Sequence, residues 1–273
     1  MNYGKKSAQK QSAKLSSKRA KNKKRFGITF IKTILVCILC IIAVGLVAGG
    51  LYAVKLIKEC PDISEVNISP NGFSTTVLDS AGNEIETLAA SGSNRTYVTI
   101  DEIPKDLQHA FVAIEDERFY KHNGIDLRGI IRAGFTGIIS GGEKMQGAST
   151  ITQQLLKNNY FTTWTKEATL LDSVNRKIQE QYLAVQLEKV EDKDTILENY
   201  LNTINLGQNT LGVEAASERY FNKSVSELTL SEDAAIAAIT QNPSKYNPIT
   251  NPKDNASRRK KVLKKMLDPC SQG

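Results

Sequence analysis

A pair of carboxylates at the end of an apolar helical pattern is the first candidate for chemistry in this sequence. Phe111 and Ile114 recur at the spacing of one helix face. Glu115 and Asp116 follow them directly. A carboxylate in this position can be half-buried, and such a group can act as a general acid or base near neutral pH. The alternative is that Glu115–Glu117 is a solvated charge run, and these residues alone favour that alternative slightly.

A hydroxyl, an amide and an ammonium group form the second candidate. The segment Gly147–Lys157 predicts a helix with Ser149 as its N-cap. On that helix Thr150, Gln154 and Lys157 lie at i, i+4 and i+7, on one face. Polar groups in one row at a helix N-terminus suit an anionic or sugar ligand. An ordinary amphipathic helix with a polar outer face explains the pattern equally well.

A second acidic residue with two cations beside it is the third candidate. Arg176 and Lys177 precede Glu180 by four and three positions, so all three meet on one side of a helix. Cations that hold a carboxylate in this way can also bind phosphate. The alternative is a surface salt bridge between Arg176 and Glu180, worth roughly 0.3 kcal/mol.

The elements that must position these groups are predicted to be helices. Pro104 can open the helix that carries the first carboxylate pair, and His122–Gly124 is typical of its stop and turn. The segment Thr195–Gly207 predicts a helix with two inward-facing apolar pairs, Ile196/Tyr200 and Leu197/Leu201. Thr229–Glu232 is a capping box, and it opens an Ala-rich helix over Asp233–Thr240.

Before these helices the sequence predicts a small β element. The segments Ser74–Asp79 and Glu84–Leu88 flank Ser80–Asn83, which has the composition of a hairpin turn. Arg95–Ile100 is rich in residues that favour strands, and it predicts a third strand.

The N-terminal part has the features of a membrane anchor. Residues 1–25 carry ten basic residues and no acid, which leaves 26 basic and 29 acidic residues in the rest of the chain. The following segment Thr33–Val54 has no charged residue and is long enough to cross a bilayer. The positive-inside rule then places the tail in the cytoplasm. Binding of nucleic acid by the tail is the minor alternative.

The cysteines and histidines indicate little. Cys37 and Cys40 fall inside the apolar segment, and the spacing of Cys60 and Cys270 does not require a disulfide. With two histidines in the whole chain and no Cys/His cluster, the sequence predicts no zinc site.

Four motifs occur in a fixed order along the chain. They are Glu-Asp-x-x-Phe-x-x-His-x-Gly at Glu115–Gly124, Gly-x-Ser-Thr-Ile-Thr-Gln-Gln at Gly147–Gln154, Arg-Lys-x-x-Glu at Arg176–Glu180 and Ile-Leu-x-x-Tyr-Leu-Asn at Ile196–Asn202. Together they resemble the motif series of the peptidoglycan glycosyltransferases, glycosyltransferase family 51, found in class A penicillin-binding proteins and monofunctional transglycosylases. The Ala-rich helix resembles the fifth motif of that series. The resemblance covers roughly residues 100–265 and favours the functional interpretation of Glu115.

The resemblance implies a mostly α-helical, lysozyme-like glycosyltransferase domain with a small β element and one N-terminal transmembrane helix. It implies lipid II as donor and acceptor, joined with inversion into glycan strands, and release of undecaprenyl pyrophosphate. Glu115 would be the general base and Glu180 the second catalytic carboxylate. No organic cofactor is expected, and a divalent cation stays possible. The residues that would bind the substrate or shape its site are Asp116, Phe119, His122, Thr150, Gln153, Gln154, Lys157, Arg176 and Lys177.

These features predict the organisation of the chain. The segments are a basic cytoplasmic tail (1–25), a transmembrane helix (26–55), a juxtamembrane linker with the β element (56–103), a glycosyltransferase domain (104–267) and a short tail (268–273). The expected location is the bacterial cell membrane, with one pass and an extracytoplasmic domain. The expected partners are lipid II, the growing glycan strand, membrane lipid and cell-wall elongation or division proteins, but not nucleic acid.

The C-terminal part leaves two interpretations open. Ser257 and Lys260 have the Ser-x-x-Lys spacing of a transpeptidase, but no Lys-Thr-Gly motif accompanies them. The chain is therefore expected to be either a monofunctional enzyme or a truncated class A penicillin-binding protein.

Two other classes of function compete with polymerisation. A glycan-cleaving enzyme, such as a lysozyme or lytic transglycosylase, also uses an acidic residue on a helical domain. It has no need of the cations Lys157, Arg176 and Lys177. A non-catalytic membrane-anchored scaffold has no need of intact carboxylates at positions 115 and 180.

Overall fold

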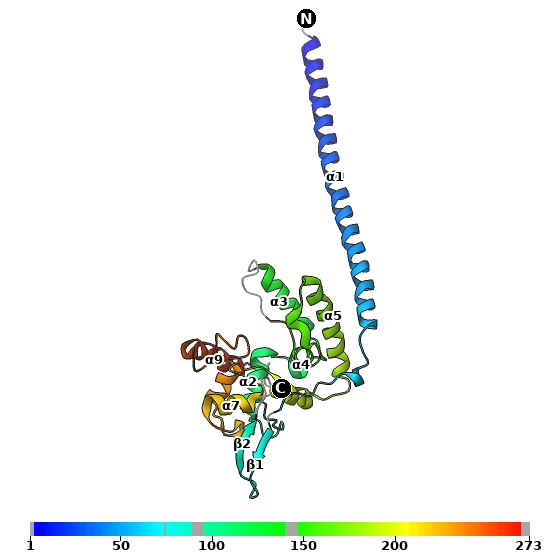
Figure 1. Cartoon of the computed structure of the whole chain (residues 1–273). Helices are drawn as coiled ribbons and strands as arrows, with labels where there is room; N and C mark the ends of the chain where they lie inside the picture. Colours follow the sequence, from blue (N-terminus) through cyan, green and yellow to red (C-terminus); the bar gives the residue numbers. More distant parts are fainter. Residues whose placement is uncertain (1–2, 74, 89–94, 140–146, 269–273) are drawn as a thin grey trace. The chain divides into compact units, whose positions relative to one another are not determined.

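The computed structural model describes residues 3–73, 75–88, 95–139 and 147–268, which form two compact units (Figure 1). The boundary between the units falls between Lys58 and Glu59. Most of the predicted C-terminal tail, including Cys270, lies outside the described residues.

The first unit is a single helix, α1 (Tyr3–Lys58). Its segment Thr29–Lys58 is 30 residues long. A helix of this length extends about 45 Å, and the hydrocarbon core of a bilayer is about 30 Å thick. No residue of the 18-residue apolar window within this segment is buried inside the protein. The prediction of an N-terminal apolar helix long enough to span a membrane is therefore confirmed.

The second unit is mostly helical, as predicted. Its α-helices in the described part of the chain are α2 (Lys105–Glu115), α3 (Leu127–Ile139), α4 (Ile151–Asn159), α5 (Leu170–Leu187), α6 (Lys193–Thr203), α7 (Val213–Phe221), α8 (Leu230–Ala237) and α9 (Pro252–Met266). Short 3₁₀ turns join them: η1 (Ile63–Glu65), η2 (Phe119–Lys121), η3 (Thr162–Lys166) and η4 (Val225–Glu227).

The core forms around α2, which packs against α8 and α9, and around α4, which packs against α5 and α6. Phe111 of α2 meets Tyr200 of α6 edge to face, with ring centroids 6.2 Å apart. Both rings are fully buried, and each such burial stabilises the fold by about 2 kcal/mol. The two apolar pairs predicted to face inward from α6 are also fully buried, which confirms that prediction.

The segment before α2 is part of the same core. Val66, Ile68 and Val98 are buried in it. The side-chain amide of Asn202 in α6 binds the backbone of Val98 twice: Oδ1 accepts from Val98 N at 3.0 Å, and Nδ2 donates to Val98 O at 2.8 Å. The predicted linker is therefore fastened to the helical domain by packing and by a polar clamp.

The contact between Asn202 and Val98 explains why one predicted strand is absent. The hairpin is confirmed, since β1 (Thr75–Leu78) pairs antiparallel with β2 (Glu84–Leu88). The predicted third strand over Arg95–Ile100 does not form. The backbone of Val98 is instead bound by the Asn202 side chain, so its hydrogen-bonding groups are not available to β2.

Two helix ends differ from the predictions. The first helix was expected to stop at His122–Gly124, but α2 ends at Glu115 because Asp116 leaves the helical conformation (φ −152°, ψ 72°). The Ala-rich helix was expected to run to Thr240, but α8 ends at Ala237. Its predicted capping box at Thr229 is present.

A buried carboxyl group makes stability depend on pH. Burial raises the pKa of Asp233 in α8 to about 7, with smaller effects from Asp106 and Glu232. The folded chain therefore keeps this proton up to about pH 7, but the unfolded chain loses it near pH 4. Because the folded state binds the extra proton in this window, stability falls as the pH rises through it.

We expect Asp233→Asn to raise the free energy of unfolding by about 2 kcal/mol at about pH 8, because a neutral amide carries no buried charge. Near pH 4 the same substitution is expected to change little, since the carboxyl group is then neutral in the fold. Thermal denaturation of both chains in detergent, at both pH values, measures the difference in their free energies of unfolding. Equal stabilisation at both would contradict the assignment.

Candidate active site

Glu115 is the last residue of α2, and its carboxylate is held by two neutral donors. Gln154 Nε2 donates to Oε2 at 3.0 Å, and the Thr240 hydroxyl donates to Oε1 at 2.5 Å. Within the described ranges, no cation forms an ion pair with Glu115. The side chain is half-buried and lines a cavity.

The buried Tyr200 contacts the Gln154 amide that binds Glu115. Burial holds the pKa of Tyr200 well above its usual range, and the charges of Glu115 and Asp116 raise it further. The phenol therefore stays protonated, and it donates to Gln154 Oε1 at 3.4 Å. This contact orients the Gln154 amide so that its nitrogen faces Glu115.

Asp116 points away from its neighbour and ties the loop after α2 to the start of α4. Its Oδ2 accepts from the backbone N–H of Ile151 at 3.0 Å, and the His122 Nε2 lies 2.9 Å from the same oxygen. Both side chains are buried. A carboxylate at a helix N-terminus also interacts favourably with the helix dipole.

The buried side chain of Glu188 lies close to the loop after α2. Glu188 accepts from the Thr152 hydroxyl at 2.5 Å and from Lys193 Nζ at 2.6 Å. Lys193 Nζ in turn lies 4.4 Å from the ring centroid of Phe119. Phe119 and His122 are both buried, and their role in shaping the site stays a prediction.

Thr150 and Gln153 hold a turn. The Thr150 hydroxyl donates to Gly124 O at 2.8 Å and accepts from Gln153 N at 3.2 Å. Thr150 is thus the N-cap of α4, and the prediction that Ser149 caps this helix is wrong. Gly124 has a φ of +84°, and a Cβ there would lie 2.5 Å from the carbonyl group of Ala184. Only glycine fits this turn.

Glu180 is fully buried and binds two cations. Arg176 Nη1 and Lys177 Nζ each donate to it at 2.6 Å. Arg176 also forms an ion pair with Glu167, and Lys177 Nζ donates to the Ser149 hydroxyl at 2.8 Å. The surface salt bridge considered from the sequence is therefore part of a network of partly exposed groups around one fully buried carboxylate.

Lys157 of α4 belongs to the same cationic region. Burial lowers the pKa of Lys157; the charge of Glu180 opposes this effect, and the nearby charges of Arg176 and Lys177 add to it. Its Nζ lies 4.0 Å from the ring centroid of Trp164. These contacts place Lys157, Arg176 and Lys177 around one buried carboxylate.

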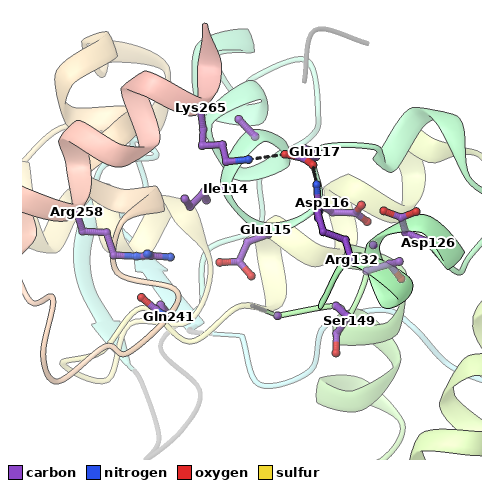
Figure 2. Close-up of a pocket in the computed structure, with 15 residues that line it drawn as sticks. Ile114, Glu115, Asp116, Glu117, Asp126, Arg132, Ser149, Gln241, Arg258 and Lys265 are labelled. Carbon is purple, nitrogen blue, oxygen red and sulfur yellow. Dashed lines mark hydrogen bonds and ion pairs between the residues drawn. The ribbon is translucent and has the colours of Figure 1, made fainter. Parts of the chain in front are cut away.

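The cavity beside Glu115 has a volume of about 260 Å³. Its walls include Glu115, Glu117, Ser149, Gln241, Arg258 and Lys265. Figure 2 shows the carboxylate of Glu115 pointing toward Gln241 and Arg258. Ser149 lines the cavity and also binds Lys177, so the cavity and the cationic cluster adjoin at this residue.

The whole of this region matches one family of known proteins. The family model described as Transglycosylase matches residues 81–267, which include every residue of the site. The chain belongs to the transglycosylase family.

Two relatives of this chain are much longer proteins. Penicillin-binding protein 1A of Clostridium botulinum is 43% identical over 256 residues, which are 91% of this chain and 30% of the relative. Penicillin-binding protein 1F of Bacillus subtilis is 45% identical over 195 residues, 71% of this chain and 26% of the relative. The chain thus spans about a third or less of these curated relatives.

One solved structure is also similar in part. The crystal structure of penicillin-binding protein 1A from Haemophilus influenzae is 26% identical in sequence, with a TM-score of 0.38. The similarity covers 71% of this chain and 18% of that chain.

The transglycosylase domain brings the predicted residues into two groups. Glu115 lines the cavity and Gln154 donates to its carboxylate, while Lys157, Arg176, Lys177 and Glu180 form the cluster beside the cavity. Asp116, Phe119, His122, Thr150 and Gln153 are buried. Asp116 contacts His122, and Thr150 and Gln153 each donate to Gly124 O. Asp116 and Thr150 also line the cavity.

Sequence reasoning missed several residues of this candidate site. Thr240 binds Glu115, and Gln241, Arg258 and Lys265 line the cavity. The only signal in the sequence was the polar pair Thr240–Gln241 after the Ala-rich helix. Among the described residues, no group of three or more His, Cys, Asp or Glu side chains is arranged to hold a metal ion.

Proposed function

We propose that this chain is a membrane-anchored peptidoglycan glycosyltransferase that polymerises lipid II into glycan strands and releases undecaprenyl pyrophosphate. The observation that carries the proposal is the position of Glu115. It is a carboxylate free of ion pairs in the described part of the chain, beside a cavity that adjoins three cations around Glu180.

Glu115 is the general base in this proposal. It accepts the proton of the acceptor sugar's 4-hydroxyl as the oxygen attacks the anomeric carbon of the donor. The bond from that carbon to the pyrophosphate oxygen breaks, and its electron pair leaves with the pyrophosphate. Attack from the opposite side inverts the anomeric centre. Gln154 and Thr240 fix the direction of the carboxylate through their hydrogen bonds.

The cations of the cluster stabilise the leaving group. Negative charge gathers on the pyrophosphate in the transition state, and cations already in place lower the barrier without reorganisation. Glu180 holds Arg176 and Lys177 in position through two ion pairs. Its carboxylate is fully buried and does not reach solvent. Lys157 adds the third positive charge.

The remaining predicted residues act by positioning. Asp116 and His122 fasten the loop after α2 to α4, and Phe119 packs below them. Thr150 and Gln153 fix the Gly124 turn. These contacts keep Glu115 and the first turn of α4 at a constant separation.

Exposed apolar side chains on the domain suit a lipid-linked substrate. Leu127, Ile131, Phe135 and Ile139 recur every four residues on α3, and each is at least 66% exposed. An exposed apolar row of this length fits contact with lipid. With α1 in the bacterial membrane and the basic tail in the cytoplasm, this domain works on the outer side. There it meets the growing glycan strand and elongation or division proteins.

Incubation of the detergent-solubilised chain with lipid II tests the proposal. We expect a ladder of glycan products on a gel from the wild-type chain. A folded chain that gives no ladder, with and without a divalent cation, would overturn the proposal. Incubation with finished glycan forms a second arm, in which shortened strands would instead support a glycan-cleaving enzyme.

A further inference from the structure

The charges around the cavity are unevenly paired. Asp126 pairs with Arg118 at 3.1 Å, and Asp116 pairs with His122 at 2.9 Å. Glu115 has only neutral donors in the described part of the chain, although Arg132, Arg258 and Lys265 line the same cavity. A cavity with nearby cations and an unpaired carboxylate needs something that keeps the two apart.

Glu117 binds two of these cations. Lys265 of α9 donates to its Oε2 at 2.5 Å, and Arg132 of α3 forms an ion pair with its Oε1 (Figure 2). The Glu117 side chain is 12% exposed, whereas the two cationic side chains are about half exposed at 44% and 50%. The long cationic side chains have room to move, and the carboxylate between them does not.

Glu117 is ionised at neutral pH. Partial burial opposes ionisation, but the hydrogen bonds and charges of Lys265 and Arg132 together lower the pKa of Glu117 below its usual value. The third cation is held differently: the Arg258 guanidinium lies 5.3 Å from the ring centroid of Tyr246.

We propose that Glu117 is an electrostatic positioning residue, which holds Lys265 and Arg132 on itself and so prevents them from pairing with Glu115. The inference rests on the proposed role of Glu115 as the base. A base in an ion pair with a lysine or arginine accepts a proton less readily, because the cation favours the charged form of the carboxylate. Glu117 thereby preserves the reactivity of Glu115 by acting through Lys265 and Arg132.

The proposal predicts opposite effects for the two partners of one ion pair. In Glu117→Gln the cations are released, and the positive potential at Glu115 rises. The acidic limb of the pH profile of kcat/KM then moves to lower pH, by about one unit. In Lys265→Met one cation is lost while Glu117 stays charged, so the limb moves to higher pH. The double variant returns the limb toward the wild-type position.

These opposite signs separate tuning from a structural role. Each single substitution breaks the ion pair between Lys265 of α9 and Glu117 in the loop after α2, so loss of that contact would affect both variants alike. The matched control is Glu232→Gln, which removes a glutamate paired with Lys223 at 3.0 Å away from the cavity. This control is expected to leave the acidic limb unchanged. Shifts of the same sign in both single variants, or no shift in either, would overturn the proposal.

A direct titration keeps this test independent of turnover. The side-chain carboxyl of Glu115 can be followed by ¹³C NMR in chain labelled at glutamate, with the signal assigned by its absence in Glu115→Gln. The Glu115 titration midpoint is expected to move in the same two directions. If the midpoints move as expected but lipid II is not polymerised, the charge arrangement stands and the proposed function fails. If lipid II is polymerised but the midpoints do not move, the proposed function stands and the role of Glu117 fails.

Discussion

The Glu115→Gln variant is expected to lose lipid II polymerisation by at least about a thousandfold while it stays folded. Glutamine has the shape of glutamate and can still accept the hydrogen bond from Thr240, so little packing is lost. It cannot take the proton of the acceptor hydroxyl. Initial rates of glycan formation measure the loss, and thermal denaturation is expected to show a stability within about 1 kcal/mol of wild type.

Glu102→Gln is the matched control for this substitution. Glu102 is an exposed glutamate whose carboxylate also accepts hydrogen bonds, from the backbone and hydroxyl of Thr99, but it does not line the cavity. We expect wild-type turnover from the control. Wild-type turnover from Glu115→Gln would refute the role of this residue as the base.

The second large effect is expected at Glu180. Glu180→Gln should reduce kcat/KM by about a hundredfold, because a neutral amide no longer holds Arg176 and Lys177 where the pyrophosphate leaves. It should also lower the free energy of unfolding by about 3 kcal/mol, because a buried charge network loses one partner. Polymerisation rates and denaturation curves give the two quantities.

Glu167→Gln is the control for the second prediction. Glu167 contacts the same arginine from a more exposed position, at 16% exposure against 0% for Glu180. We expect this variant to lose no more than about tenfold in rate, because solvent reaches this partly exposed pair and screens it more than the pair with Glu180. Equal losses in the two variants would show that the pair with Glu167, rather than the buried carboxylate, positions Arg176.

The sequence predicted those parts of the fold that depend on local patterns. The apolar helix, the hairpin and the capping box at Thr229 each follow from composition and spacing over a few residues, and each is present. The third strand failed because Asn202, about a hundred residues further on, binds the backbone of Val98. No local pattern reports a competitor at that distance in the sequence.

In the candidate site, too, the sequence predicted residues that belong to local motifs and missed those brought in by distant packing. Glu115 and Glu180 lie in motifs that the sequence displays, and Lys157 lies three residues after one; the structure places each beside the cavity or in the cluster next to it. Thr240 and Lys265 come to α2 only through the packing of α8 and α9 against it. Glu117 was visible as one member of an acidic run, but its partners were not.

The clamp between Asn202 and Val98 bears on where the chain can be cut. The match to the family begins at residue 81, yet Val66 and Ile68 are buried in the same core as α2 and α6. A version that starts at residue 81 leaves part of the core uncovered, and one that starts at Pro104 also removes the donor to the buried Asn202 Oδ1, while Nδ2 keeps only its bond to Glu198 O. The smallest piece that keeps these contacts intact starts near Asp62, before the first turn of the folded domain.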